Sequence, residues 1–160
     1  MRNYFFDTSA LVKAYAVEAG SGRVRAMLKG LTTLPALSRV IISNLARPEA
    51  ASALNQMMSS PSAAQRGFGS HDRKTLPAKL ALHLGEESQL EVSLADPHME
   101  SAADLVWKHR LRGADAVHLA TAIAARQKVP SGSEFYFVSS DVALNRAAAA
   151  EGLEVIDPAA

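Results

Sequence analysis

The sequence contains no cysteine, which excludes a disulfide framework and any zinc site built from thiolates. A metal ion in this protein would have to bind oxygen or imidazole ligands. The first 15 residues place a charge after only a few apolar residues, so they lack the uninterrupted apolar stretch of a signal peptide or a membrane span. We therefore expect a cytoplasmic protein without a membrane segment.

The sequence also has little excess charge, since its formal net charge at pH 7 is +1. Proteins that bind nucleic acid mainly through phosphate contacts usually carry a clear basic excess or a basic patch. Evidence for such a ligand must therefore come from a particular site. The chain has 160 residues, 48% of them hydrophobic, which is enough to bury one core, and we expect a single domain over residues 1–160.

Short apolar runs alternate with helical patterns along the whole chain. The apolar and β-branched runs predict strands at 4–6, 40–42, 90–94, 135–138 and 155–156. Apolar residues three or four positions apart predict helices after residue 7, from about 48, and over 76–84, 97 to about 113, 113–127 and 142–150. This alternation favours an α/β fold, with a mainly parallel central sheet between two helical layers.

One segment, residues 59–74, interrupts this alternation. Its sequence, SSPSAAQRGFGSHDRK, is a cluster of small, polar and glycine residues without periodicity. Such a composition predicts a loop or a mobile excursion within the domain rather than a domain boundary. Pro48 interrupts the helical pattern before this segment, and we expect that helix to start or kink there.

Four acidic residues follow predicted strands or begin predicted helices. Asp7, Glu49 and Asp141 each come shortly after a strand, and Asp115 lies in the first turn of a helix. Ligands of parallel α/β sheets bind beyond the carboxyl ends of the strands, so we expect these acids to lie at one edge of the sheet. Carboxylates gathered in this way suit Mg²⁺ or Mn²⁺, which can activate water and stabilise the leaving oxygen in phosphodiester hydrolysis.

Each acid also has a simpler explanation. Asp7 and Asp141 are suited to capping the helices that follow them. Asp115 suits the positive end of a helix dipole, and Glu49 could be a solvated helix acid. Only the four acids taken together favour a site.

Two further side chains have both a functional and a structural interpretation. His118 lies one helical turn after Asp115, but hard cations prefer oxygen, so we interpret it as a histidine hydrogen-bonded within the structure. Trp107 has apolar neighbours and is interpreted as a core or dimer contact rather than a platform for base stacking.

Four stretches of the sequence together resemble the PIN-domain family, and its VapC-type toxins in particular. In order, they are YFFDTSALVKAY, ISNLARPEAASAL, LRGADAVHLATA and FYFVSSDVALNRAAAAEGLEVI. The resemblance implies a PIN-like three-layer α/β/α sandwich and a divalent-metal-dependent endoribonuclease activity. It further implies that Asp7, Glu49 and Asp115 are the primary ligands of Mg²⁺ or Mn²⁺. Asp141 matches a fourth acid that binds a second metal or orients water.

The same resemblance implies roles for residues beside the acids. Ser9 and Ser140 match hydroxyls beside the first and last aspartates, which would hydrogen-bond the metal ligands. Arg112, Lys13 and Arg47 are close in sequence to the acidic motifs and are candidates to hold RNA phosphates. Scattered basic residues are otherwise ordinary solvated surface.

The resemblance also implies partners, namely an RNA substrate, a second toxin subunit in a homodimer, and a cognate antitoxin whose C-terminal segment covers the site. These are the features of a type II toxin–antitoxin pair. Two alternatives remain open: a PIN nuclease that acts in RNA processing or on structured DNA without an antitoxin, and a catalytically inactive PIN binding module. A phosphatase with an aspartyl nucleophile would need a second acid two residues after Asp7, where this chain has Ser9.

Overall fold

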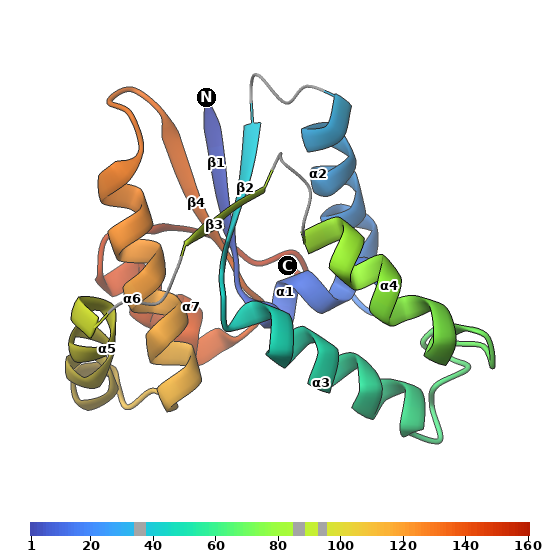
Figure 1. Ribbon diagram of the computed structural model, residues 1–160. Helices are drawn as coiled ribbons and strands as arrows, with labels where there is room; N and C mark the ends of the chain where they lie inside the picture. The colour runs from blue at the N-terminus through green and yellow to red at the C-terminus, as the bar shows by residue number, and fades with distance from the viewer. Residues whose placement is uncertain (34–37, 85–88, 93–95) are drawn as a thin grey trace.

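The computed structural model describes residues 1–33, 38–84, 89–92 and 96–160. The described strands form one sheet: β1 (Arg2–Phe6), β2 (Ser38–Ser43), β3 (Gln89–Val92), β4 (Glu134–Val138) and β5 (Glu154–Ile156). Their order is β3-β2-β1-β4-β5, and all neighbouring pairs are parallel (Figure 1). The described helices are α1 (Thr8–Leu11), the 3-10 turn η1 (Val12–Ala14), α2 (Ser21–Thr33), α3 (Ala46–Ser59), α4 (Asp72–Leu84), α5 (Asp96–His109), α6 (Gly113–Lys128) and α7 (Val142–Ala150).

The central strands bury side chains on both faces of the sheet. Phe5 and Phe137 stack with ring centroids 5.7 Å apart and join a core formed with α5, α6 and α7. Phe6 and Val138 point the other way, into a core formed with the helices from α1 to α4. Because successive residues of a strand face opposite sides, this apolar pattern produces two helical layers around one sheet. The predicted three-layer α/β/α fold is confirmed (Figure 1).

The order of the strands places a topological switch point between β1 and β4. From β1 the chain adds β2 and β3 on one side of the sheet, whereas β4 and β5 lie on the other. In the parallel register Phe6 lies opposite Val138, so β1 and β4 end together. The following residue, Asp7, donates its backbone N–H to Val138 O at 3.0 Å. A crevice beyond the carboxyl ends of two such strands is the usual ligand site of this architecture.

The segment expected to be a loop over residues 59–74 is shorter in the structure. Residues 60–71 form turns, and Phe68 from this segment is buried in the core with 8% exposure. Helix α4 already begins at Asp72 and carries Pro77 in its second turn. The prediction of a helix over 76–84 therefore missed its first residues, which lie in the small and polar segment that was expected to be a loop.

Three other predicted boundaries can be compared with the structure. Helix α5 ends at His109 rather than near Gly113, because Arg110 adopts a left-handed backbone conformation with φ of 56°. The strand expected over 90–94 agrees with β3 as far as Val92, and Ser93 and Leu94 lie outside the described residues. Pro48 is in the first turn of α3, where a proline is tolerated.

Trp107 lies on the surface of α5 and not in the core. Its side chain is 86% exposed, so its assignment to the core is wrong, and a dimer contact remains a prediction. Among the helices of the described part of the chain, we find none whose length and apolar character would allow it to cross a membrane.

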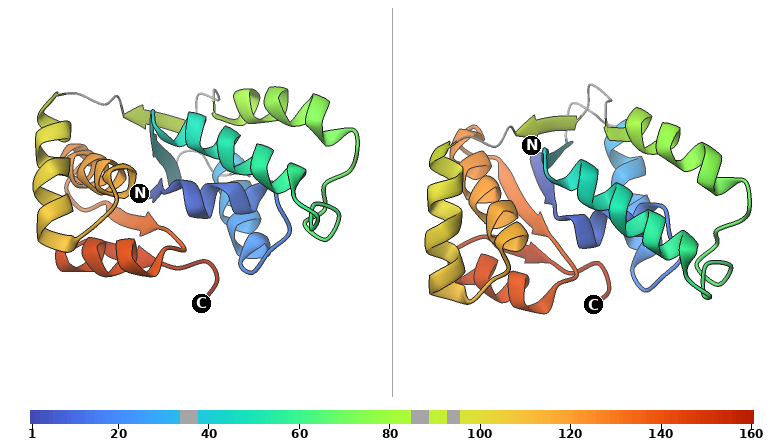
Figure 2. Two further views of the ribbon diagram at one scale, coloured as in Figure 1. Left: turned by 90° about the horizontal axis from the view of Figure 1, so that it is seen from below. Right: turned by 60° about the horizontal axis from the view of Figure 1, so that its bottom comes forward.

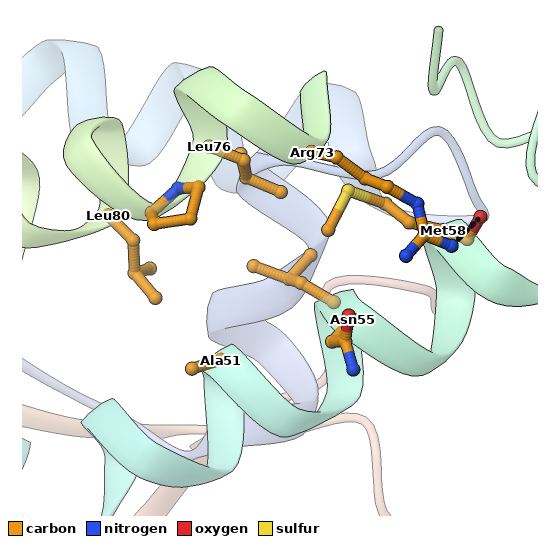
Figure 3. A pocket seen from close by; sticks show the side chains of 8 residues that line it. Ala51, Asn55, Met58, Arg73, Leu76 and Leu80 are labelled. Carbon is orange, nitrogen blue, oxygen red and sulfur yellow. Dashed lines mark hydrogen bonds between the residues drawn. The ribbon is translucent and has the colours of Figure 1, made fainter. Parts of the chain in front are cut away.

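Helices α3 and α4 border a groove, and some of its lining residues belong to the core formed with α1 to α4 (Figure 3). The groove is lined by Ala51, Leu54, Asn55, Met58, Arg73, Leu76, Pro77 and Leu80. Arg73 lies at one end, where its guanidinium donates to the backbone oxygen of Met58 at 3.4 Å and to Ser59 Oγ at 2.9 Å. The two helices are thus tied together beside the turns that connect them.

Glu151, which follows α7, ties that helix to the end of α5. Its Oε1 lies 2.8 Å from Lys108 Nζ and also pairs with His109 Nε2. These hydrogen bonds, first from Lys108 and then from His109, lower the pKa of Glu151 below its ordinary value. The contacts of Glu151 with Lys108 and His109 hold the end of α5 immediately before the short connection that leads into α6.

Replacing Glu151 with glutamine should lower the free energy of unfolding at pH 7 by about 0.2–1 kcal/mol, the usual range for exposed pairs. Because the folded-state pKa is depressed, the stabilisation is present above the unfolded-state pKa and is lost as the pH falls through the folded-state value. Urea denaturation at pH 7 and at pH 3 measures this. Glu100→Gln, at an exposed position of α5, is the matched control, and an equal effect of Glu151→Gln at both pH values would contradict the account.

Candidate active site

Asp7 connects the end of β1 to the start of α1 and is held from several directions. Its side chain is buried, with 4% exposure. Oδ2 accepts hydrogen bonds from Ser9 N at 3.2 Å, Ser9 Oγ at 2.6 Å and Ser139 Oγ at 3.1 Å. Asp7 is therefore a helix cap, as one interpretation of the sequence required, and its carboxylate also has a fixed orientation at the sheet edge. Ser9 is a hydrogen-bond partner of Asp7, as expected.

The second hydroxyl on Asp7 comes from Ser139 and not from Ser140. Ser139 Oγ also accepts a hydrogen bond from Asp141 N at 3.1 Å, so one hydroxyl joins the first and last aspartates. Ser140 contributes its backbone N–H, which donates to Ser9 Oγ at 3.0 Å, while its own Oγ is buried without a hydrogen-bond partner. The predicted role of Ser140 is corrected accordingly.

Asn145 supports this arrangement from α7, and the sequence analysis did not identify it. Its Nδ2 donates to the backbone oxygen of Ser139 at 3.0 Å. Asn145 lies one helical turn after Asp141, and this spacing is the one signal in the sequence that could have indicated it.

Glu49, in the first turn of α3, is held by two donors from other elements. Its Oε2 accepts a hydrogen bond from Thr8 Oγ at 2.7 Å and lies 2.6 Å from His118 Nε2. The hydrogen bond from His118 lowers the pKa of Glu49, with further help from Thr8 and from the charge of His118, against an opposing effect of burial. The prediction that His118 is hydrogen-bonded within the structure is confirmed. Thr8 was not identified, although it directly follows Asp7.

Asp115 and Asp141 complete the acidic edge. Asp141 caps α7 by accepting the backbone N–H of Leu144 at 2.9 Å. Asp115 is in the first turn of α6, and burial is the largest cause that raises its pKa. The negative charges of Asp141 and Asp7 raise that pKa further, whereas Arg112 and His118 oppose the rise. The charges of Asp141 and Asp7 thus act on Asp115, and His118 Nε2 lies 2.6 Å from Glu49 Oε2 and 3.8 Å from Asp7 Oδ1. These contacts lie at the carboxyl edge of the sheet, which faces the viewer in the left view of Figure 2.

The chemistry of these side chains fits a hard divalent cation. All four acids offer oxygen donors. The pKa of Asp115 is raised first by burial and then by the charges of Asp141 and Asp7, and a cation would oppose both effects. In the part of the chain that the structure describes, no three acidic or histidine side chains already surround one point closely enough to hold an ion. Oε2 of Glu49 is already engaged by its two donors.

The basic residues predicted to hold phosphates divide into two groups. Lys13 is buried with 6% exposure, and its Nζ lies 3.4 Å from Glu18 Oε2. Because Lys13 is buried and paired with Glu18, it is not placed to contact a phosphate, and this expectation is wrong. Arg112 and Arg47 are exposed, and Arg112 is close enough to Asp115 for its charge to act on the pKa of that carboxyl.

Comparisons with known proteins agree on one family. The PIN domain family model matches residues 4–150. Two relatives from Mycobacterium tuberculosis strains, ribonuclease VapC45 and ribonuclease VapC49, are each 35% identical over 120 residues, which cover 75% of this chain and 74% of theirs.

Solved structures agree on the fold. The structure of VapBC2 from Rickettsia felis, bound to a DNA fragment from their promoter, matches with a TM-score of 0.56 and 14% identity, over 96% of this chain and 97% of that one. PAE2754 from Pyrobaculum aerophilum matches with a TM-score of 0.59 and 19% identity, over 97% of this chain and 92% of that one.

Proposed function

This chain belongs to the PIN domain family, and we propose that it is a divalent-metal-dependent endoribonuclease and the toxin of a type II toxin–antitoxin pair. The ribonuclease activity is that of its two VapC relatives. In this proposal Asp7, Glu49, Asp115 and Asp141 hold Mg²⁺ or Mn²⁺.

The observation that carries the proposal is the convergence of acids from separate elements at one edge of the sheet. Ser139 Oγ donates to Asp7 and accepts from the backbone N–H of Asp141, and His118 Nε2 lies 2.6 Å from Glu49 Oε2 and 3.8 Å from Asp7 Oδ1. Asp115 begins α6 beside them, and the charges of Asp141 and Asp7 add to the effect of burial in raising its pKa. Independent helix caps need not converge in this way. A cluster of acids that repel each other costs stability, and such a cost is typical of a functional site.

Different residues of the chain have different roles in the proposed phosphodiester hydrolysis. A bound divalent ion stabilises the charge that develops on the phosphate and makes a nearby water more acidic. Ser9 and Ser139 fix the carboxylate of Asp7, and Thr8 and His118 fix that of Glu49, so both acids keep their orientation when substrate binds. Arg112 and Arg47 hold the flanking RNA phosphates. Water then attacks phosphorus and gives up a proton, the P–O bond to a ribose oxygen breaks, and that oxygen takes up a proton and leaves as an alcohol.

Cleavage assays with the purified chain test the enzymatic part of the proposal. A single-stranded RNA and a DNA of the same sequence would be incubated either with MnCl₂ or with EDTA. The MnCl₂ concentration would be about 5 mM, which saturates a typical weak metal site. We expect internal cuts in the RNA only, and only with metal. Cleavage that persists in EDTA would contradict metal dependence, and preferential cleavage of DNA would favour a different PIN nuclease.

Expression in a bacterial host tests the toxin part separately. We expect growth arrest on induction of this chain, and relief when its proposed antitoxin, a small protein expected from a neighbouring gene, is expressed together with it. Harmless expression of an active nuclease would favour a role in RNA processing. We also propose a homodimer, for which the exposed Trp107 is a candidate contact; sedimentation of wild type and Trp107→Ser would show whether this residue contributes.

Replacing Arg112 with alanine should weaken RNA binding roughly tenfold, the equivalent of about 1.4 kcal/mol. The slope of log affinity against log salt should fall by about 0.7, as expected for the loss of one contact to a single-stranded phosphate. Fluorescence anisotropy at several salt concentrations, in an Asp7→Asn background to prevent cleavage, measures both.

Lys128→Ala is the matched control, because Lys128 is exposed at the opposite end of α6, about 20 Å along the helix from Asp115. If the two variants have equal effects, Arg112 has no special contact with the RNA.

A further inference from the structure

His118 lies at the centre of the contacts that join the candidate site. It is on α6, one helical turn after Asp115, and its side chain is 1% exposed. One ring nitrogen, Nε2, lies 2.6 Å from Glu49 Oε2. The other, Nδ1, lies 3.0 Å from Ser43 Oγ at the end of β2. The imidazole therefore joins α6 to both β2 and α3.

The chemistry of these contacts fixes the orientation of the ring. A carboxylate can only accept hydrogen bonds, so Nε2 carries the hydrogen that is donated to Glu49. Nδ1 then faces the hydroxyl of Ser43, a residue that is itself fully buried. Partners on both nitrogens leave a single orientation that satisfies the buried ring.

Glu49 depends on this ring for its position. Its side chain is 30% exposed and has three rotatable bonds, so without partners it would sample several rotamers towards solvent. His118 and Thr8 both contact the same oxygen, Oε2. His118 Nε2 is also 3.8 Å from Asp7 Oδ1, so Glu49 and Asp7 both lie close to the same imidazole nitrogen.

We propose that His118 is a positioning residue that holds Glu49 beside Asp7 and thereby increases the affinity of the site for a divalent cation. The inference rests on the proposed function, since it assumes that these acids bind a metal ion. His118 does not itself bind the ion in this account. Its hydrogen bond removes the rotational freedom that Glu49 would otherwise lose on metal binding.

A simpler role for His118 would be to fill space in the core. The two roles differ in which substitution preserves function. Glutamine can place its amide nitrogen where Nε2 lies and can still donate to Glu49, whereas asparagine reaches only as far as Nδ1. If His118 only fills space, the larger change, to asparagine, should lower folding stability and have no specific effect on metal binding.

Calorimetric titration of MnCl₂ into the purified full chain tests the proposal without relying on activity. His118→Asn should weaken Mn²⁺ binding roughly 10- to 100-fold, the usual effect of removing a partner of a ligand. His118→Gln should stay within a few-fold of wild type. His98→Asn, the same substitution on α5, should leave the affinity unchanged.

The possible results separate this inference from the proposed function. Wild-type affinity in His118→Asn, or equal losses in His118→Asn and His118→Gln, would overturn the positioning role while metal binding by the wild type still stands. A wild type that binds no Mn²⁺ would overturn both. If His118→Asn fails to fold, Ser43→Ala is the second variant: it removes only the partner of Nδ1 and should weaken binding a few-fold, and an unchanged affinity would overturn the inference.

Discussion

Asparagine in place of Asp7 is expected to reduce metal-stimulated RNA cleavage at least about 100-fold, because the substitution removes the charge of a proposed ligand. The fold should survive. Asparagine caps helices about as well as aspartate, and its side-chain oxygen can still accept the hydrogen bonds from Ser9 and Ser139. The measurement is the initial rate of cleavage with MnCl₂, together with circular dichroism as a check on folding.

Asp104→Asn provides the matched control for this prediction. Asp104 is exposed on α5, so the same loss of one negative charge occurs away from the acidic edge. We expect wild-type cleavage from this variant. An Asp7→Asn protein that cleaves RNA at the wild-type rate would remove Asp7 from the proposed site.

Asparagine in place of Asp115 is expected to reduce the rate of RNA cleavage about as much as Asp7→Asn does. The same substitution should make the metal-free protein more stable. Burial and the charges of Asp141 and Asp7 raise the pKa of Asp115 in the folded state, so its negative charge opposes folding near neutral pH. Solvent screens a half-buried carboxylate, which limits the gain to under about 1 kcal/mol. In a chain of this size the corresponding increase in Tm is at most about 2–4 °C.

The pH dependence follows from the direction of that shift. An acid with a raised folded-state pKa destabilises the fold at pH values above it, and the effect disappears below the unfolded-state pKa, at roughly pH 4. The increase in Tm of Asp115→Asn in EDTA should therefore be present at pH 7.5 and absent at pH 3.5. Adding MnCl₂ at pH 7.5 should raise the Tm of the wild type more than that of the variant. Lower stability of Asp115→Asn in EDTA at pH 7.5 would contradict the proposed repulsion.

The elements that place Asp7 and Asp141 were predictable because their signals are local. Each follows a short apolar strand and precedes a helix that needs an N-cap. The carboxyl ends of parallel strands share one edge of the sheet, so the two residues were expected to be neighbours before their contacts were known. The same reasoning placed Asp115 in the first turn of α6.

Other features of the site depend on tertiary packing that the sequence does not encode locally. Ser139 and Ser140 are adjacent hydroxyls just beyond β4, and the turn after the strand determines which of them faces Asp7. Lys13 carries a charge and was expected at the surface, but Glu18 pairs with it in the interior.

The hydrogen bond between His118 and Glu49 could not be predicted from the sequence either. The histidine itself was expected to be hydrogen-bonded within the structure, but its partner, Glu49, is 69 residues away along the chain. No local sequence pattern links the two residues, and they come together because α6 packs against β2, which precedes α3 in the chain.

Crystals grown with MnCl₂ would test the central claim most directly, because Mn²⁺ gives an anomalous signal that locates it without assumptions about ligands. We predict an anomalous peak at the carboxyl edge of β1 and β4, within coordination distance of Asp7 and at least one of Glu49, Asp115 and Asp141, with oxygen as the coordinating element. A map with no peak at these residues at saturating Mn²⁺, or with its peaks only elsewhere on the protein, would contradict the assignment of this acidic edge as the metal site.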